Sequence, residues 1–169
     1  MEMRDTLKSY VKSLAKAEFI IIPRKERAEL STDFLSRYPQ LPKDYLDFLQ
    51  QFKTITNKAD NVWFNSIEDF NESSDNEFRW NEFELMSLEA LADDEEECER
   101  IRQFWNTHIP IVMSVKDGYQ FLCIDLSKEN YGKVYGGVEP EFEDSVEVVC
   151  DNFNQLLEMF FSDDNSIMI

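Results

Sequence analysis

Carboxylates are the side chains in this sequence with the clearest potential for chemistry. Their densest run is Asp93-Asp94-Glu95-Glu96-Glu97-Cys98-Glu99. Such a run can be a loop or a solvated helix start, since the helix macrodipole favours negative side chains at the N-terminus. It can also be an electrostatic docking face that attracts a basic partner. A calcium site has less support, because the run lacks the alternating ligands and the central glycine of a calcium loop.

Other potentially reactive residues form no recognisable catalytic arrangement. A second acidic group consists of Glu139, Glu141, Glu143 and Asp144, but in a chain with 35 acidic residues such pairs of carboxylates arise by chance. The single histidine, His108, is the only side chain that could complete a Ser-His-Asp or Cys-His arrangement, and we expect it to have a packing or surface role. Nucleotide-binding strings and the zinc-protease string H-E-x-x-H do not occur. The sequence therefore predicts no catalytic residue, no metal site and no cofactor.

The cysteines and apolar segments bear on the location of the protein. Cys98, Cys123 and Cys150 are odd in number and widely spaced, which fits neither a disulfide framework nor a C-x-x-C metal clip. The longest apolar run, Phe19–Ile22, is far shorter than the roughly 20 residues of a membrane span. The N-terminus lacks the apolar core of a secretory signal. We expect a protein of the reducing cytoplasm, with Cys123 buried in a strand.

The net charge narrows the classes of partner. The chain has 35 Asp and Glu against 17 Lys and Arg, a formal charge of −18. This balance argues against direct binding to nucleic acid or to an anionic membrane, because both require basic side chains. The acidity is uneven, since residues 1–60 hold 11 basic and 9 acidic residues whereas residues 61–100 hold 2 basic and 14 acidic ones. A chain of 169 residues that is 43% hydrophobic predicts a single folded domain over 1–169.

Helical spacing dominates the N-terminal third of the chain. Apolar residues recur at helical intervals over 3–17. Ser31 or Thr32 can cap a second helix, which Pro39 ends. A third helix is predicted within 41–52, with Pro42 in its first turn.

Strand-like patterns follow residue 60. Residues 62–64 and 83–86 are each predicted to be a strand followed by a serine-capped helical turn, so that the same short pattern occurs twice. In the first copy of this pattern, Ser66 and Asp69 can form a capping pair. The polar segment 71–76 between the two copies predicts a loop.

A hairpin is the strongest local signal in the chain. Two β-rich runs within 109–125 flank Asp117-Gly118, which predicts a type I′ turn. Further strands are predicted at 133–136 and 146–149, and Asp151 is expected to cap a final amphipathic helix. The resulting fold is α+β: N-terminal helices, a central and mainly antiparallel meandering sheet, and a C-terminal helix packed on the sheet.

Five motifs occur in an order that characterises one known family. They are Leu-Pro-x-x-Tyr-x-x-Phe-Leu at 41–49, Ile-Pro-Ile at 109–111, the Asp-Gly hairpin ending in Cys-Ile-Asp at 123–125, Gly-Lys-Val-Tyr at 132–135 and Asn-Phe-Asn-Gln-Leu-Leu at 152–157. The ordered set resembles the SUKH superfamily, which includes the yeast cell-wall-assembly regulator and many bacterial immunity proteins. The resemblance runs from about Ser31 to Ser162, with residues 1–30 as an N-terminal helical extension.

This resemblance implies a non-catalytic domain that binds a partner protein. In bacteria such proteins mostly neutralise a cognate polymorphic toxin, often a nuclease. The charge agrees with that role, because a nuclease presents a basic cleft to phosphates and a carboxylate-rich surface can obstruct the cleft. Trp63 or Trp80, if exposed, could anchor the interface, although a core position is the ordinary expectation for either. The candidate acidic contact residues are Asp93, Asp94, Glu95, Glu96, Glu97, Glu99, Glu139, Glu141, Glu143 and Asp144.

Two other functions are compatible with the sequence. One is an intracellular regulatory or scaffold module similar to the yeast member, with several endogenous partners. The other is a carboxylate-based hydrolase, which would need a cleft holding two acids with perturbed pKa values. The identity of the toxin, the mode of inhibition and the oligomeric state are left open at this point.

Overall fold

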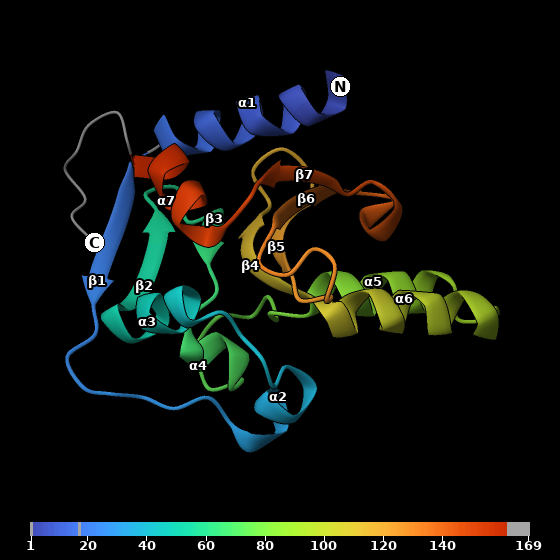
Figure 1. Ribbon diagram of the computed structural model, residues 1–169, viewed down its shortest axis with the longest axis horizontal. Helices are drawn as coiled ribbons and strands as arrows, with labels where there is room; N and C mark the ends of the chain where they lie inside the picture. Colours follow the sequence, from blue (N-terminus) through green and yellow to red (C-terminus); the bar gives the residue numbers. More distant parts are fainter. Residues whose placement is uncertain (1, 17, 162–169) are drawn as a thin grey trace.

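A computed structural model describes residues 2–16 and 18–161 and has one antiparallel sheet at its centre. Within these residues seven strands lie side by side in the order of the sequence, and each neighbouring pair is antiparallel (Figure 1). The strands are β1 (Phe19–Pro23), β2 (Phe52–Asn57), β3 (Val62–Phe64), β4 (His108–Ser114), β5 (Gln120–Asp125), β6 (Val134–Val138) and β7 (Glu147–Cys150). The predicted α+β meander is confirmed.

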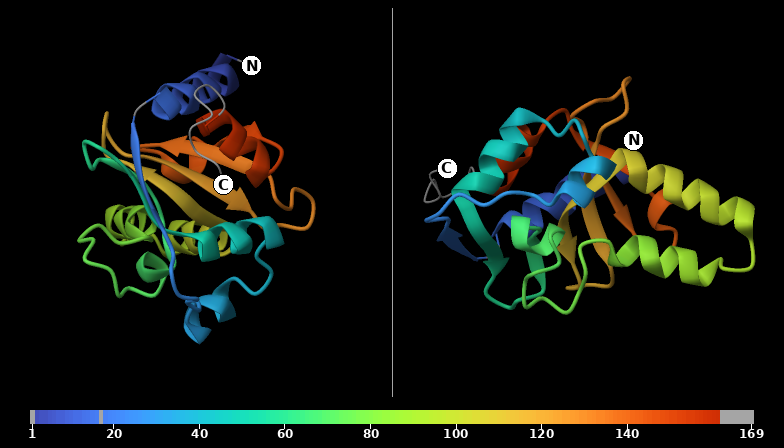
Figure 2. Two further views of the ribbon diagram at one scale, coloured as in Figure 1. Left: turned by 90° about the vertical axis from the view of Figure 1, so that its left-hand side faces the viewer. Right: turned by 90° about the horizontal axis from the view of Figure 1, so that it is seen from below.

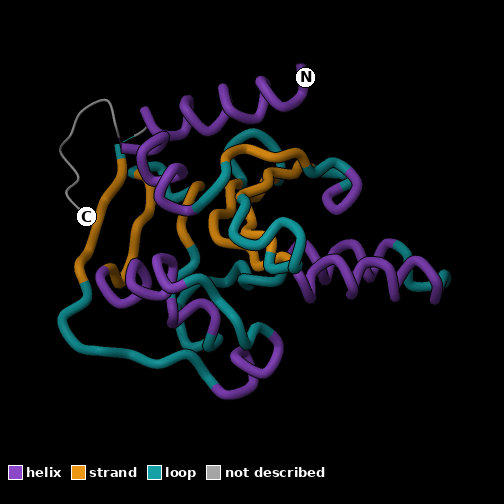
Figure 3. Tube along the Cα trace, viewed as in Figure 1, coloured by secondary structure: helices purple, strands orange, loops and turns teal. Residues whose placement is uncertain are grey.

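Helices cover the two faces of this sheet (Figures 1 and 3). They are α1 (Glu2–Lys16), α2 (Thr32–Arg37), α3 (Lys43–Gln51), α4 (Ile67–Phe70), α5 (Glu82–Ala90), α6 (Glu95–Thr107) and α7 (Phe153–Phe161), with a short 3-10 turn, η1 (Phe142–Asp144). α1, α3 and α7 pack on one face, whereas α5 and α6 form a hairpin that packs on the other. In Figure 2 this helical hairpin projects from the body of the molecule.

Two of the predicted helix caps are present. The Ser31 hydroxyl accepts a hydrogen bond from the Phe34 amide at 3.2 Å and begins α2. Ser66 and Asp69 form a complete capping box at α4. α1 matches the helix expected over 3–17, except that Ala17 lies outside the described residues. α3 ends at Gln51, so Phe52 already belongs to β2.

One predicted strand is wrong. Residues 83–86 lie within α5, which is helical from Glu82 to Ala90. An alternation over only four residues does not distinguish a strand from a helix. Here the helix is favoured because Phe83 inserts its ring into the core beneath α5 and α6, stacked on Phe142 at 4.9 Å.

Two details of the turns also differ from expectation. Of the Asp117-Gly118 pair, only Gly118 has a positive φ, of 84°, so the connection is not a type I′ turn, and it extends over residues 115–119. The side chain that caps the first turn of α7 belongs to Asn152, whose Oδ1 accepts from the Gln155 amide at 2.9 Å, and not to Asp151.

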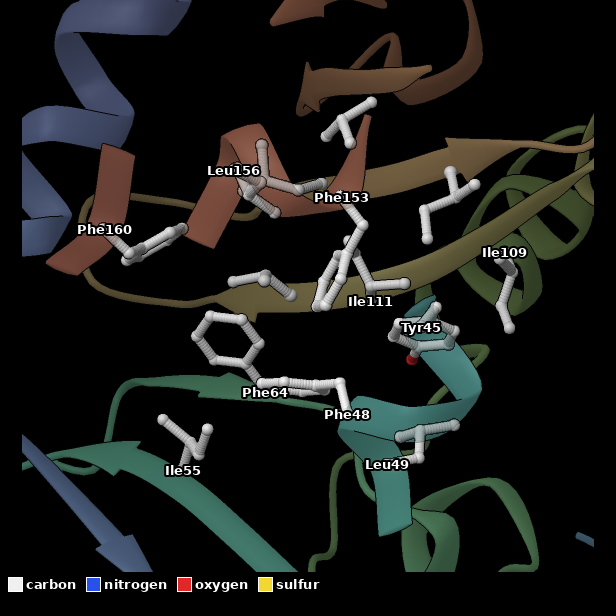
Figure 4. Close-up of a cluster of buried hydrophobic side chains, with 14 of the residues drawn as sticks. Tyr45, Phe48, Leu49, Ile55, Phe64, Ile109, Ile111, Phe153, Leu156 and Phe160 are labelled. Atoms are coloured by element: carbon white, nitrogen blue, oxygen red, sulfur yellow. The ribbon is translucent and has the colours of Figure 1, made fainter. Parts of the chain in front are cut away.

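The core consists of two clusters separated by the sheet. On the first face, rings from α3, β3 and α7 converge, including Phe48, Phe64 and Phe153 (Figure 4). On the second face, Trp105 of α6 packs against Phe121 at 4.9 Å between ring centroids. β4 and β5 are buried along both faces for nearly their whole length. These two strands are therefore the most enclosed part of the fold.

The N-terminal extension is part of the same core. Val11 and Leu14 of α1 are buried, and α1 packs against α7 and β7. The extension is not purely helical, because β1 pairs with β2 at the edge of the sheet. Residues 1–30 thus add one helix and one strand to the domain.

We expect Leu14→Ala to destabilise the whole domain, because it leaves a cavity where α1 meets the core. The expected loss in the free energy of unfolding is about 2–5 kcal/mol. Lys12→Ala, at an exposed position of the same helix, should change it by less than about 0.5 kcal/mol. Urea denaturation followed by circular dichroism measures both variants, and equal midpoints would show that α1 is not docked.

Candidate protein-binding site

The first predicted acidic group lies at the end of the α5–α6 hairpin. Residues 91–99, called the hairpin tip here, contain the turn between the helices and the first turns of α6 (Figure 2). The Asp94 carboxylate caps α6 by accepting from the Glu97 amide at 3.1 Å. Asp93, Glu95 and Glu96 are exposed. The run is thus a helix start that also presents carboxylates to solvent.

Arginines of α6 compensate much of this charge. Arg100 contacts Glu97 at 2.8 Å and Asp144 of η1 at 2.8 Å, so it joins the two predicted acidic groups across 44 residues of sequence. Hydrogen bonding to Arg100 lowers the pKa of Glu97. Arg102 lies within 3.3 Å of Glu95 and also contacts Glu99. The hairpin tip is therefore acidic, and its charge is partly neutralised by ion pairs.

Glu143 serves the core and is not a surface contact. It is only 8% exposed, and its Oε2 accepts a hydrogen bond from Trp105 Nε1 at 2.7 Å. Burial raises the pKa of Glu143, and the hydrogen bonds from Trp105 and Ser87 offset this rise only in part. Its exposed neighbour Glu139 closes the β4–β5 hairpin by accepting from the Tyr119 amide.

Neither candidate tryptophan is an exposed anchor. Trp63 and Trp80 are 8% and 7% exposed, so the core interpretation holds for both. Trp80 packs edge-on against the rings of Phe34 and Phe70. Trp63 donates its indole N–H to Asn65 at 3.2 Å and lines a hollow on the surface.

This hollow has a volume of about 980 Å³. Its floor includes Thr54 and Thr56 of β2 together with Trp63, and residues 73–78 form a wall. Six carboxylates line it against a single basic residue, Lys53. We call it the acidic hollow. Its carboxylates belong to Asp60, Glu68, Asp69, Asp75, Glu77 and Glu82.

Two of these carboxylates hold the local structure together. Glu68 makes a bidentate pair with Arg24, at 2.8 and 2.9 Å, and this pairing lowers the pKa of Glu68. Asp69 belongs to the capping box of α4. Among residues 2–16 and 18–161, Asp60, Asp75 and Glu77 make no ion pair. In the hollow, two carboxylates are therefore held by structural contacts, while three others keep a negative charge without an ion pair among the described residues.

The sequence pointed to the hollow only indirectly. Five of its six carboxylates contribute to the acidic count of residues 61–100, but the densest acidic run lies at the hairpin tip instead. The hollow is assembled from the β2–β3 turn, α4 and the loop before α5, which are separate in sequence.

The residues considered for catalysis are engaged in packing. His108 stacks on Phe104 at 4.0 Å, and its Nε2 lies 3.3 Å from the Asp125 carboxylate, as expected for a packing role. Cys98, Cys123 and Cys150 are all buried, and burial raises the pKa of Cys123. In the described part of the chain no group of His, Cys, Asp and Glu side chains could hold a metal ion. Nor is any described helix both long and apolar enough to cross a membrane.

The fold and these surfaces define an α+β domain that presents carboxylates to its surroundings. The chain belongs to the SMI1 / KNR4 family (SUKH-1), whose sequence profile matches residues 33–159. The match confirms the resemblance found from the motifs. No curated protein sequence matches the chain. Membership of this family fits a role in protein–protein interaction or immunity.

Removing the Glu143 carboxylate should destabilise the fold without touching the surface charge of the hairpin tip. Glu143→Ala leaves the buried Trp105 N–H without its acceptor, which costs about 1–3 kcal/mol of unfolding free energy. The control Glu141→Ala removes a neighbouring exposed carboxylate and should stay within about 0.5 kcal/mol. Urea denaturation compares the two, and equal stabilities would contradict the structural role of Glu143.

The Arg24–Glu68 pair should give stability that is lost in acid. The folded-state pKa of Glu68 is lowered, so the carboxylate stabilises the protein fully above its unfolded pKa of about 4.3 and less as the pH falls through the lowered value. Glu68→Gln should lower the free energy of unfolding by about 1–3 kcal/mol at pH 7. This difference between the variant and the natural protein should shrink by pH 3. Glu77→Gln is the matched control at an exposed position. If the difference in unfolding free energy between Glu68→Gln and the natural protein did not depend on pH, the stabilising role of the Arg24–Glu68 pair would be refuted.

Proposed function

We propose that the protein is a non-catalytic bacterial immunity protein that binds and neutralises a cognate polymorphic toxin, a basic nuclease, through its acidic surface. The observation that carries the proposal is the distribution of charge. Exposed carboxylates occur at the hairpin tip and in the acidic hollow of a chain whose formal charge is −18. Membership of the SUKH-1 family supports the same role.

The physical basis is competition with phosphates. A nuclease binds its substrate by placing basic side chains against the closely spaced negative charges of the backbone. A folded surface rich in carboxylates can occupy or obstruct that cleft. The field of such a surface also accelerates association with a basic protein and repels acidic competitors.

Several local contacts support a non-catalytic role. The His108 ring is held between the Phe104 ring and the Asp125 carboxylate, and only 14% of its side chain is exposed. The buried Cys123 thiol has a raised pKa, which disfavours the reactive thiolate. The perturbed carboxylates Glu68 and Glu143 have structural partners in Arg24 and Trp105. None of these groups is left available for a substrate in the arrangement described.

The proposal is tested with the toxin of the neighbouring gene. We expect the coding sequence to lie directly downstream of a gene for a large secreted toxin, and co-expression to abolish killing by the C-terminal domain of that toxin. Binding of the purified partners, measured by isothermal titration calorimetry, should weaken at least tenfold between 0.05 and 0.5 M NaCl, because salt screens exposed charges. An unrelated toxin domain serves as the control.

A toxin that stays fully active on co-expression would contradict the proposal. If no toxin gene adjoins the coding sequence and several endogenous partners bind directly, the regulatory scaffold role, similar to that of the yeast member, would replace it.

A further inference from the structure

The face of the sheet that bears the acidic hollow is only partly covered. One cross-strand row runs from Ile20 of β1 through Thr56 and Trp63 to Met113. Residues paired in this way share a face of the sheet. Along the row exposure falls from 50% at Ile20 to 8% at Trp63 and 0% at Met113. The α5–α6 hairpin thus covers the sheet from β3 onward and leaves β1 and β2 open on this face.

Exposed isoleucines continue the floor of the hollow. Ile22 is 48% exposed and pairs with Thr54, just as Ile20 pairs with Thr56. Both threonines line the hollow. The two isoleucines therefore lie on the same face, one strand away, and form an apolar margin beside the carboxylates. Exposed apolar side chains on an edge strand are unusual without a partner, because they favour association.

The charge of the hollow selects among possible occupants. Asp60, Asp75 and Glu77 are exposed and make no ion pair within the described residues. Lys53 is the single basic residue of the lining. A second copy of this chain, with its own charge of −18, would bring repulsion. A segment carrying Lys or Arg is the complementary occupant.

We propose that the acidic hollow and the adjoining Ile20 and Ile22 form the docking surface for an extended basic segment of the partner protein. In such a segment alternate side chains point in opposite directions, so a Lys or Arg at every second position can face the carboxylates. When the segment lies along the boundary between the hollow and the isoleucines, the apolar side chains between the basic ones point toward Ile20 and Ile22. The inference rests on the proposed function, because the basic segment is taken to belong to the toxin that this protein neutralises.

The hairpin tip is a weaker contact surface than the hollow. Arg100 and Arg102 already pair with four of the surrounding carboxylates, and a partner would have to displace these arginines. The tip also offers one exposed large apolar side chain, Leu91. Carboxylates without an ion pair among the described residues occur in both places, but only the hollow sets them beside two exposed isoleucines. Apolar surface with a polar margin is the combination found at energetically important interface centres and their rims.

Two charge-matched triple variants test the inference. The hollow variant is Asp60→Asn/Asp75→Asn/Glu77→Gln, which spares Glu68 and Asp69 because both hold the local fold. Asp60 has a positive φ of 59°, a conformation that Asn tolerates well. The tip variant is Asp93→Asn/Glu96→Gln/Glu141→Gln, at three exposed positions. Each removes three negative charges, and urea midpoints within 0.2 M of the natural protein establish that both remain folded.

The first probe is a synthetic twelve-residue peptide of alternating lysine and valine, with alternating glutamate and valine as its control. Calorimetry at 0.05 M NaCl should show binding of the lysine peptide that weakens at least tenfold in the hollow variant and less than twofold in the tip variant. In protein labelled at isoleucine methyls, the signals of Ile20 and Ile22 should shift, whereas that of Ile101, a buried residue of α6, should not. Equal weakening in both variants, unmoved Ile20 and Ile22 signals, or peptide-independent dimers seen by sedimentation would overturn the inference.

The second probe is the C-terminal domain of the neighbouring toxin, and it separates the two proposals. We expect the hollow variant to lose protection on co-expression while the tip variant keeps it. Protection that survives in the hollow variant but fails in the tip variant would refute the docking surface and leave the immunity function standing. Specific peptide binding in the hollow without neutralisation of the toxin would support the docking surface and refute the immunity function.

Discussion

The burial of β4 and β5 on both faces is the constraint on which the rest of the structure depends. Both strands are almost continuously apolar, so the chain must supply a helical layer on each side of the sheet. The first layer, α1, α3 and α7, comes from the two ends of the sequence. The second comes from the insertion between β3 and β4, which contains the α5–α6 hairpin. The order of the elements follows from this division.

The two layers differ in width, and the difference creates the candidate site. On the first face the row Ile21, Ile55, Phe64 and Val112 is packed throughout against the helices. On the second face the covering begins at Trp63, whose ring contacts Phe78 at 5.6 Å between centroids. Trp63 therefore marks the boundary between the core and the hollow, which explains how a buried tryptophan can also line the surface.

Local features could be predicted from the sequence, whereas features that combine distant segments could not. The caps at Ser31 and Ser66 depend on residues within three positions and were correct. A strand is wrongly predicted at residues 83–86, in the first half of α5, because four residues of alternation carry too little periodicity, and the helical state depends on packing with α6. The Arg100–Asp144 pair spans 44 residues, so the link between the two acidic groups cannot be predicted from the sequence.

The two acidic surfaces differ in how their charge can act. The hairpin tip projects at the opposite end of the molecule from β1 (Figure 1), and its charge is partly neutralised by Arg100 and Arg102. Charge of this kind acts at long range, where it raises the rate of encounter with a basic protein and is screened by salt over about 8–10 Å. Charge in the hollow lies beside apolar surface, so contact there would exclude water and strengthen each ion pair as the complex forms. Association rate and complex lifetime are therefore governed by different parts of this chain in the proposed complex, although both derive from the same excess of carboxylates.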